Sequence, residues 1–261
     1  MERYGLIGEH ITYSKSPIIH QFIASKLGID IRYDLLDMEE KDIPHLFKHL
    51  RRGIFKGFNV TIPHKQSVMR YVDILTPKAK RIQAVNTIYM KGDLIVGDNT
   101  DYDGFLGLIT YHHLNVKDKN ICILGSGGAA KAAYTVLEDL GAHITVVTRK
   151  HPLEQKTFQQ VITYDQMMDR EIDIIVNATP VGTYPNHHES VLPIEVVENK
   201  IVIDLIYNPP ITAIMRQAKS AYGGLMMLII QAIKSEEIWF NRTIELSQSL
   251  LNELKEVIYH E

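Results

Sequence analysis

The first hundred residues carry three clusters of polar side chains, each close to an apolar stretch. The clusters are Ser14 and Ser16 in YSKSP, Asn59, Thr61 and Lys65 in NVTIPHK, and Asn86 followed by Asn99, Thr100 and Asp101 in GDNTD. Hydroxyl groups just before a helix could bind a carboxylate, and amide, carboxylate and ammonium groups could bind hydroxyls. If the clusters converge, a polyhydroxy acid is the natural ligand. Each cluster alone is also compatible with ordinary turn or N-cap chemistry.

A glycine-rich segment, GSGGAAK at residues 125–131, predicts a second ligand. It follows the apolar stretch KNICILG and opens a helical stretch, which is the setting in which this pattern binds a dinucleotide. Gly125 allows a tight turn, Gly127 lets the backbone approach a pyrophosphate, and Ala130 lets the helix pack close to the sheet. The alternative is a glycine-rich turn of an ordinary α/β protein. The predicted cofactor contacts in this loop are Gly125, Ser126, Gly127, Gly128 and Ala129.

The end of the next strand discriminates between two cofactors. An NAD site would carry an acidic residue there for the ribose 2′-hydroxyl, but this chain has Thr148-Arg149-Lys150. Arg149 and Lys150 would attract a 2′-phosphate, and the planar guanidinium of Arg149 can bind it through two hydrogen bonds. NADP is therefore predicted over NAD; the alternative is a solvated basic strand end. Asn177 and Thr179 follow a later strand and are candidate cofactor contacts, although a plain turn explains them equally well.

Lys65 is the candidate acid–base group. A nicotinamide-dependent dehydrogenase must move a proton when a ketone becomes an alcohol, and a lysine charge can polarise the carbonyl. A free lysine titrates well above neutral pH. Asp101 would hold the ammonium group of Lys65 in place. The alternative is a solvated surface charge.

These side chains need an alternating α/β framework to position them. Strands are predicted at 4–8, 31–37 and 55–61, helices at 16–27 and 41–51, and a hairpin at 85–100 that turns at Lys91-Gly92-Asp93. Further strands are predicted at 119–125, 142–150, 172–180 and 200–210, with helices at 103–114, 127–141, 225–240 and 243–258. In the helix at 16–27, Ser16 would be the N-cap and Pro17 the first helical residue. The pattern predicts an N-terminal α/β domain with a mixed sheet and a second, Rossmann-like domain.

Composition narrows the class of protein. The 261 residues are 45% hydrophobic and 23% charged with a formal net charge of −3, which argues against nucleic acid or an anionic membrane as the main partner. The longest purely apolar run, 225–230, is too short to span a bilayer. A single cysteine, Cys122, fits a reducing compartment, so we expect a cytoplasmic protein. The histidine pairs lack the pattern of a zinc site, and no metal is expected.

The motifs together resemble the shikimate dehydrogenase family over essentially the whole chain. Those that fall in the family's order and spacing are YSKSP, NVTIPHK, AVNT, GDNTD, GSGGAAK, NATPVG, DLIYNP and GGLMMLIIQA. The resemblance implies NADP-dependent, reversible reduction of 3-dehydroshikimate to shikimate, on the route to chorismate and the aromatic amino acids. It also implies two α/β domains separated by a cleft: a substrate domain at 1–103, completed by the C-terminal helices at 226–261, and an NADP-binding domain at 104–225.

The same resemblance assigns roles to individual residues. Ser14 and Ser16 would bind the substrate carboxylate, and Lys65 with Asp101 would be the catalytic pair. The predicted contacts to ring hydroxyls are Thr61, Asn86, Asp101 and Gln231, with Tyr207 as another substrate contact. Leu205, through its backbone, and Gly224 would lie beside the nicotinamide. The chain departs from the family at Thr148-Arg149-Lys150, where Asn-Arg-Thr or Asn-Arg-Ser is usual, and at N-T-D-Y-D-G, where N-T-D-G is frequent.

Two alternatives to this assignment stay open. One is a quinate/shikimate dehydrogenase that uses NAD or both cofactors, and Arg149 argues against an NAD preference. The other is a non-catalytic module that binds NADP or shikimate, which would be expected to lack the Lys65–Asp101 pair. The sequence leaves open whether the protein is a monomer or a homodimer.

Overall fold

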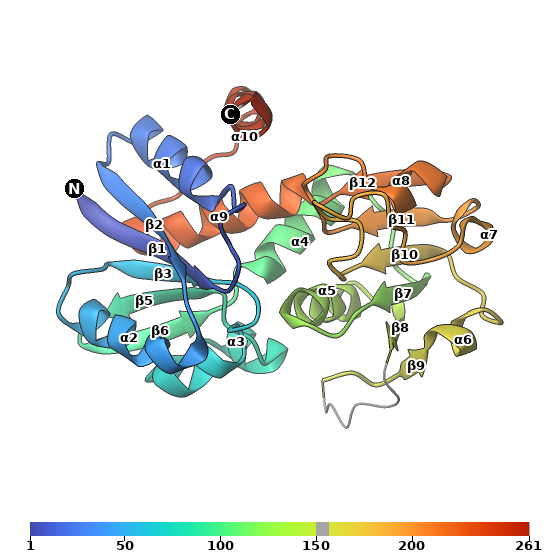
Figure 1. The fold of residues 1–261 in the computed structure, drawn as a ribbon, viewed down its shortest axis with the longest axis horizontal. Helices are drawn as coiled ribbons and strands as arrows, with labels where there is room; N and C mark the ends of the chain where they lie inside the picture. The colour runs from blue at the N-terminus through green and yellow to red at the C-terminus, as the bar shows by residue number, and fades with distance from the viewer. Residues whose placement is uncertain (150–156, 261) are drawn as a thin grey trace. The chain divides into compact units, whose positions relative to one another are not determined.

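The computed structural model describes residues 1–149 and 157–260 (Figure 1). The chain divides into two compact units, Met1–Thr100 with Ile229–Glu261, and Asp101–Leu228. The domain boundaries predicted from the sequence lie after residues 103 and 225, whereas the two compact units divide after residues 100 and 228. No helix of the described residues is long and apolar enough to cross a bilayer.

The first unit is built on a six-stranded mixed sheet with the order β2-β1-β3-β5-β6-β4. Its strands are β1 (Glu2–Gly8), β2 (Ile31–Asp37), β3 (Gly57–Val60), β4 (Ile74–Leu75), β5 (Thr87–Lys91) and β6 (Leu94–Asp98). β1 pairs in parallel with β2 and β3, whereas β5 pairs antiparallel with β3 and β6. The predicted hairpin is confirmed, since Lys91 pairs with Leu94 across Gly92-Asp93.

Strand periodicity sends alternate side chains of this sheet into two apolar cores. Phe58 and Val60 enter a core with the buried face of α2 (Ile43–Arg51), where Ile43, Leu46, Phe47 and Leu50 recur at helical spacing. The opposite core contains Tyr4, Leu6 and Tyr33, with Trp239 of α9 (Leu225–Phe240) packed against it. Trp239 fits because Gly57 has no side chain; a Cβ there would lie 2.3 Å from the Trp239 Nε1. The other helical segments of this unit are α1 (Ser16–Lys26), η1 (Glu40–Asp42), η2 (Ser67–Tyr71), α3 (Pro77–Ile82) and α10 (Gln248–His260).

The second unit contains an all-parallel sheet with the order β12-β11-β10-β7-β8-β9. Its strands are β7 (Asn120–Leu124), β8 (His143–Thr148), β9 (Val161–Thr163), β10 (Ile174–Asn177), β11 (Ile201–Asp204) and β12 (Ser220–Gly223). Counted along the chain this order is 6-5-4-1-2-3, the doubly wound Rossmann arrangement, in which ligands bind beyond the carboxyl ends of the strands. The predicted fold class, with one mixed sheet and one Rossmann-like sheet, is confirmed. The helices of this unit are α4 (Asp101–Tyr111), α5 (Gly128–Asp139), α6 (Tyr164–Met167), α7 (Ile194–Val197), α8 (Ala213–Gln217) and the start of α9.

Three details of the sequence-based prediction are wrong. Strands predicted at 172–180 and 200–210 are shorter, because β10 ends at Asn177 and β11 ends at Asp204. The short strands β4, β9 and β12 have no counterpart in the prediction, since each has only two to four residues. Helix α1 begins at Ser16 itself, with Lys15 as the N-cap residue and no side chain as a cap.

Candidate functional site

In the first unit, the residues of NVTIPHK lie at the carboxyl end of β3, beside the end of β1. The Thr61 N–H donates to the Ile7 carbonyl at 2.8 Å, and the Glu9 N–H donates to the Ile62 carbonyl at 3.1 Å. Gly8 leaves room for this approach, because a Cβ there would lie 2.6 Å from the Thr61 Cγ2. Thr61 is thereby placed next to the segment that leads from β1 towards Ser14.

Lys65 follows a tight turn that contains a cis Ile62–Pro63 peptide bond. The turn is closed by the His64 N–H, which donates to the Thr61 carbonyl at 2.9 Å. The Lys65 carbonyl then accepts a 2.7 Å hydrogen bond from the Val85 N–H, so its backbone lies beside the residue that precedes Asn86. The Lys65 side chain is half-buried, unlike a fully solvated surface lysine.

Asn86 joins this region to the segment before Asp101. Its Oδ1 accepts hydrogen bonds from the Thr100 N–H at 2.7 Å and from the Thr87 hydroxyl at 3.1 Å, and its Nδ2 donates to the Thr100 Oγ1 at 3.1 Å. Both Asn86 and Thr100 are buried. Asp101 is the next residue, buried at the first position of α4. The structure therefore brings together Thr61, Lys65 and Asn86 through the backbone and fixes the peptide that leads into Asp101.

Asn59, the member of NVTIPHK with no predicted contact, is the centre of a buried polar cluster. We call Asn59, Asn86, Thr87, Thr100 and Ser235 the Asn59 cluster. The Asn59 Nδ2 lies 2.9 Å from the Ser235 Oγ on α9, and the Ser235 Oγ lies 2.9 Å from the Thr87 Oγ1 and 3.1 Å from the Thr100 Oγ1. The cluster holds α9 against the ends of β3 and β5. Ser235 was missed by sequence analysis because it lies 176 residues from Asn59.

The two serines form their own local arrangement. The Ser14 Oγ accepts a 3.2 Å hydrogen bond from the Ser16 N–H and lies 3.1 Å from the Ser16 Oγ. Both hydroxyls thus lie at the start of α1, where backbone N–H groups lack helical partners. Gln231 is half-buried on α9, one turn before Ser235, whose hydroxyl donates to its carbonyl at 3.0 Å.

A buried acid and histidine lie next to the Asn59 cluster and had no role in the predicted site. The His20 Nδ1 is 2.8 Å from the Glu236 Oε1, and the His20 ring stacks on Tyr33 at 4.4 Å. Burial lowers the pKa of His20 and raises the pKa of Glu236, because it disfavours the charged form of each. Both pKa shifts favour an uncharged pair at neutral pH, and the His20 tautomer sets which of the two atoms donates. In the sequence Glu236 lies in a polar part of α9, KSEE at 234–237, so no local signal marks it as buried.

In the second unit, the glycine-rich loop has the shape that a dinucleotide needs. Gly125 follows β7 with φ +100°, and a Cβ there would lie 3.1 Å from the Ala178 carbonyl oxygen. A Cβ on Gly127 would meet no atom within 4 Å, so the backbone before α5 faces open space. Ala130 is fully buried against the sheet. Ser126, Gly128 and Ala129 are half-buried around the first turn of α5, whose N-terminus fits a pyrophosphate.

The other predicted cofactor residues lie at the carboxyl ends of the same sheet. Thr148 is the buried last residue of β8 and Arg149 is exposed directly after it, while Lys150 lies outside the described residues. Gly224 packs so closely on Leu205 that a Cβ would lie 2.1 Å from the Leu205 carbonyl oxygen. Tyr207 is half-buried in the loop after β11.

Asn177 and Thr179 bond to one another and to a residue that sequence analysis missed. The Asn177 Oδ1 accepts from the Thr179 hydroxyl at 2.7 Å, and its Nδ2 donates to the Asp204 Oδ1 at 3.0 Å. Asn177 and Asp204 are fully buried neighbours at the ends of β10 and β11. The signal that the sequence offered for this residue is an acidic side chain, Asp204, at the end of the apolar strand IVID.

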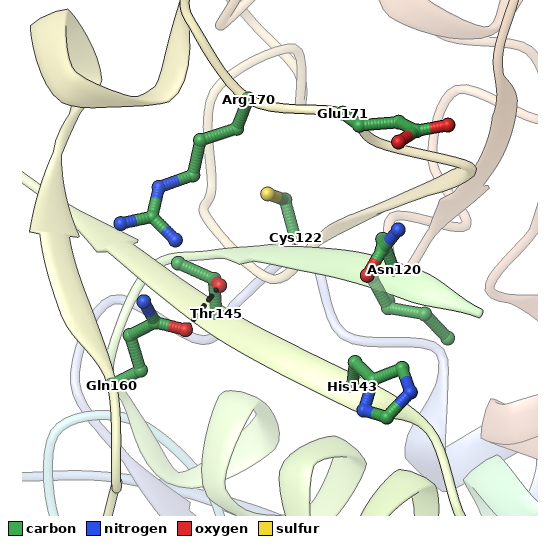
Figure 2. A pocket seen from close by; sticks show the side chains of 8 residues that line it. Asn120, Cys122, His143, Thr145, Gln160, Arg170 and Glu171 are labelled. Atoms are coloured by element: carbon green, nitrogen blue, oxygen red, sulfur yellow. Dashed lines mark hydrogen bonds between the residues drawn. The ribbon is translucent and has the colours of Figure 1, made fainter. Parts of the chain in front are cut away.

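A cavity of about 210 Å³ lies elsewhere on this sheet (Figure 2). It opens at the amino-terminal parts of β7 and β8, at the opposite end of these strands from the glycine-rich loop and Arg149. The residues lining it are Asn120, Ile121, Cys122, His143, Thr145, Gln160, Arg170 and Glu171. None of them is a predicted substrate or cofactor residue, so this cavity is separate from the candidate site.

Tyr102 lies where this chain departs from the usual N-T-D-G, and its side chain contacts a neighbouring helix. Its hydroxyl donates to the Asp139 Oδ2 on α5 at 2.8 Å. The departure therefore ties α4 to the helix that begins at the glycine-rich loop.

Comparisons with known proteins give one family. Residues 6–88 match the family model for the shikimate dehydrogenase substrate binding domain. The NADP(+) shikimate dehydrogenase of Clostridium beijerinckii is 39% identical over 248 residues, covering 92% of each chain. A crystal structure of shikimate dehydrogenase 1 from Peptoclostridium difficile has a TM-score of 0.92 and 38% identity, covering 100% of this chain and 99% of the other. The Thermus thermophilus enzyme, solved with NADP(H) and shikimate, has a TM-score of 0.87 and 29% identity, covering 100% and 99%.

Proposed function

This chain belongs to the shikimate dehydrogenase family, and from that premise we propose that it catalyses the reversible reduction of 3-dehydroshikimate to shikimate with NADPH, on the route to chorismate and the aromatic amino acids. One observation carries the proposal beyond family membership. Backbone hydrogen bonds hold Thr61, Lys65 and Asn86 together, and the Asn86 side chain fixes the peptide before Asp101. These are the residue types that a hydroxylated ring and a proton transfer require.

The substrate is bound through two sets of side chains. Ser14 and Ser16 bind the carboxylate at the start of α1, where their hydroxyls already lie 3.1 Å apart. The ring hydroxyls and the reacting oxygen are bound by Thr61, Asn86, Asp101, Gln231 and Tyr207. The rigid bonding of Asn86 supports this assignment, since a contact fixed in advance loses little entropy on binding.

The proton and the hydride come from different sources. NADPH, when bound, supplies a hydride to the carbonyl carbon. Lys65 gives a proton to the carbonyl oxygen during reduction and takes it back during oxidation, so that two hydrogens are added to the C=O bond in all. Asp101 holds the ammonium group of Lys65 at that oxygen, from the N-terminus of α4, where a helix favours negative charge.

The cofactor is NADP rather than NAD. The open backbone at Gly127 and the N-terminus of α5 fit the pyrophosphate, and Arg149 at the end of β8 fits the 2′-phosphate. The Clostridium beijerinckii relative is named as NADP-dependent, which supports the same choice.

The decisive experiment follows NADPH oxidation by absorbance with 3-dehydroshikimate as substrate. Rates are then compared for shikimate and quinate, each with NADP and with NAD. We expect shikimate with NADP to be the best pair; quinate with NAD as the best pair would instead favour the quinate/shikimate dehydrogenase. Binding of both ligands without turnover would indicate a non-catalytic module. Light scattering at several protein concentrations would decide between a monomer and a homodimer.

A further inference from the structure

Asp204 is a fully buried carboxylate at the carboxyl end of β11. Its Oδ1 accepts hydrogen bonds from the Asn177 Nδ2 at 3.0 Å and from the Ile206 N–H at 3.1 Å. Its Oδ2 accepts from the Thr212 hydroxyl at 2.6 Å. Within the part of the chain that the structure describes, Asp204 forms these contacts without an ion pair to a Lys, Arg or His. Three neutral donors therefore stabilise it.

A buried carboxylate without a countercharge destabilises the folded state. Burial without a countercharge raises the pKa of Asp204 to about 6, although all three hydrogen bonds favour the ionised form. The two preceding residues of β10 and β11 on the same face, Ile175 and Val202, belong to the apolar core. An apolar side chain would continue that core more cheaply than a carboxylate. The acid is thus better explained by what it binds than by the stability of the sheet.

The three donors come from two loops that carry predicted ligand contacts. Asn177 opens the loop after β10, and its Oδ1 accepts from both the N–H and the hydroxyl of Thr179. Ile206 and Thr212 belong to the loop after β11, which also contains Leu205 and Tyr207. The Ile206 carbonyl accepts a 3.0 Å hydrogen bond from the Gly224 N–H. One carboxylate therefore joins the segments expected beside the nicotinamide.

We propose that Asp204 is a positioning residue that fixes the loops after β10 and β11 in the geometry that binds the nicotinamide half of NADP. This inference rests on the proposed function. It also changes the role of Asn177, whose fully buried side chain bonds Asp204 and Thr179 and acts on the cofactor through the loop. Neither residue touches the reacting atoms.

The test measures NADPH binding by titration of NADPH fluorescence, together with steady-state kinetics, on Asp204→Ala. Removing the carboxylate leaves the Asn177 amide, the Ile206 N–H and the Thr212 hydroxyl without their acceptor. We expect the dissociation constant for NADPH to rise at least about fivefold, the lower end of typical couplings between a remote group and a ligand. The value of kcat should also fall, because a misplaced loop misaligns the cofactor.

A matched control lies at the opposite end of the same sheet. The Asp173 carboxylate accepts a 2.9 Å hydrogen bond from the Asn120 N–H at the amino ends of β10 and β7. Asp173 is half-buried, and Asp173→Ala removes this one carboxylate bond at a strand end. It should lower thermal stability while leaving NADPH affinity unchanged. A purely structural role for Asp204 would leave the NADPH affinity of the folded protein unchanged in both variants.

A conservative variant tests the geometry directly. In Asp204→Asn the amide oxygen can still accept from Asn177 and Ile206, while the new NH₂ group faces Thr212, whose hydroxyl can accept instead of donate. NADPH affinity should therefore return close to the wild-type value. If Asp204→Ala does not fold, Thr212→Val removes the 2.6 Å bond alone and should weaken NADPH binding in the same direction by a smaller factor.

The outcomes separate this inference from the proposed function. Wild-type protein that fails to bind or oxidise NADPH would contradict the proposed function itself. If the wild-type protein is active and Asp204→Ala binds NADPH with unchanged affinity, only the role of Asp204 is overturned. Where the alanine variant does not fold, unchanged affinity in Thr212→Val has the same meaning. Equal losses of affinity in Asp204→Ala and Asp173→Ala would overturn it as well.

Discussion

Replacing Asn59 by alanine should destabilise the first unit more than replacing Ser235 by alanine, although the two side chains bond one another. The difference follows from which partners each variant leaves without a hydrogen bond. The Asn59 Oδ1 accepts a 2.8 Å bond from the buried Tyr33 hydroxyl, and its Nδ2 donates to the Ser235 Oγ at 2.9 Å and to the Asn86 carbonyl at 3.2 Å.

Asn59→Ala leaves the Tyr33 hydroxyl buried without an acceptor, which costs about 1–3 kcal/mol, and the missing amide adds a small cavity. A loss of about 2–4 kcal/mol is expected. In Ser235→Ala, Thr87 and Thr100 keep the Asn86 Oδ1 as a partner and Asn59 keeps the Asn86 carbonyl. That variant should lose only about 1 kcal/mol.

The assay uses the only tryptophan of the chain, Trp239, as a reporter. Its ring packs on Gly57, and its Nε1 donates to the Ile88 carbonyl, so its fluorescence follows the first unit. Urea unfolding gives the free energy of unfolding for each variant. Tyr13→Phe removes the hydroxyl of an exposed side chain and serves as a control that should change little.

Two results would refute this reasoning. Equal losses in Asn59→Ala and Ser235→Ala would mean that the Tyr33 hydroxyl finds another partner. A loss below about 1 kcal/mol in Asn59→Ala would mean that water replaces the amide, and that the Asn59 cluster is not a closed buried network.

Three further predictions concern catalysis, the cofactor and pH. Lys65→Ala should lower kcat by about 10²–10⁴-fold, the usual contribution of a general acid–base, while shikimate affinity measured by calorimetry is roughly kept; an unchanged kcat would remove Lys65 from catalysis. Arg149→Gln should raise KM for NADPH by about 10-fold or more, the loss of a charge-assisted contact, with little change for NADH in the same assay. Burial raises the pKa of Glu236 to about 9. Between neutral pH and pH 9 the folded state therefore keeps a proton that the unfolded state has released. The free energy of unfolding should fall over this range as the pH rises. Glu236→Gln should flatten that fall in urea titrations, whereas equal slopes would contradict an uncharged His20–Glu236 pair.

Much of the fold could be predicted because its signals are local. Apolar runs of strand length, glycine at turns and the spacing of Ile43, Leu46, Phe47 and Leu50 each depend on a few neighbouring residues. Strand ends were less predictable. The predicted strands at 172–180 and 200–210 extend too far, because the chain leaves the sheet after Asn177 and Asp204. The side chains of these two residues bond the following loops, which is a tertiary effect.

The candidate site was predictable in residue type but not in its supporting contacts. Motifs such as NVTIPHK and GSGGAAK identify side chains that could meet a ligand. The roles of Asn59 and His20 could not be predicted, because their partners Ser235 and Glu236 lie 176 and 216 residues further along the chain. No local pattern encodes a hydrogen bond of that separation.

The two units use the same three-residue pattern to different ends. In each unit a strand leads into Asn-x-Thr: Asn59 lies in β3 with Thr61 directly after that strand, and Asn177 is the last residue of β10 with Thr179 two residues later. In the second unit the Asn177 Oδ1 accepts from the Thr179 hydroxyl at 2.7 Å, so that hydroxyl forms a hydrogen bond within its own loop. In the first unit the Asn59 Oδ1 accepts from Tyr33 instead.

The two segments therefore differ in what the asparagine oxygen already binds within the protein. The Thr61 backbone is fixed by the Ile7 carbonyl, while the Asn59 oxygen next to it is already occupied by Tyr33. The Thr179 hydroxyl bonds its own loop. For Thr61 we keep the prediction that its hydroxyl binds the substrate. Tyr33, which donates to the Asn59 Oδ1, lies in β2, a strand that carries none of the predicted site residues.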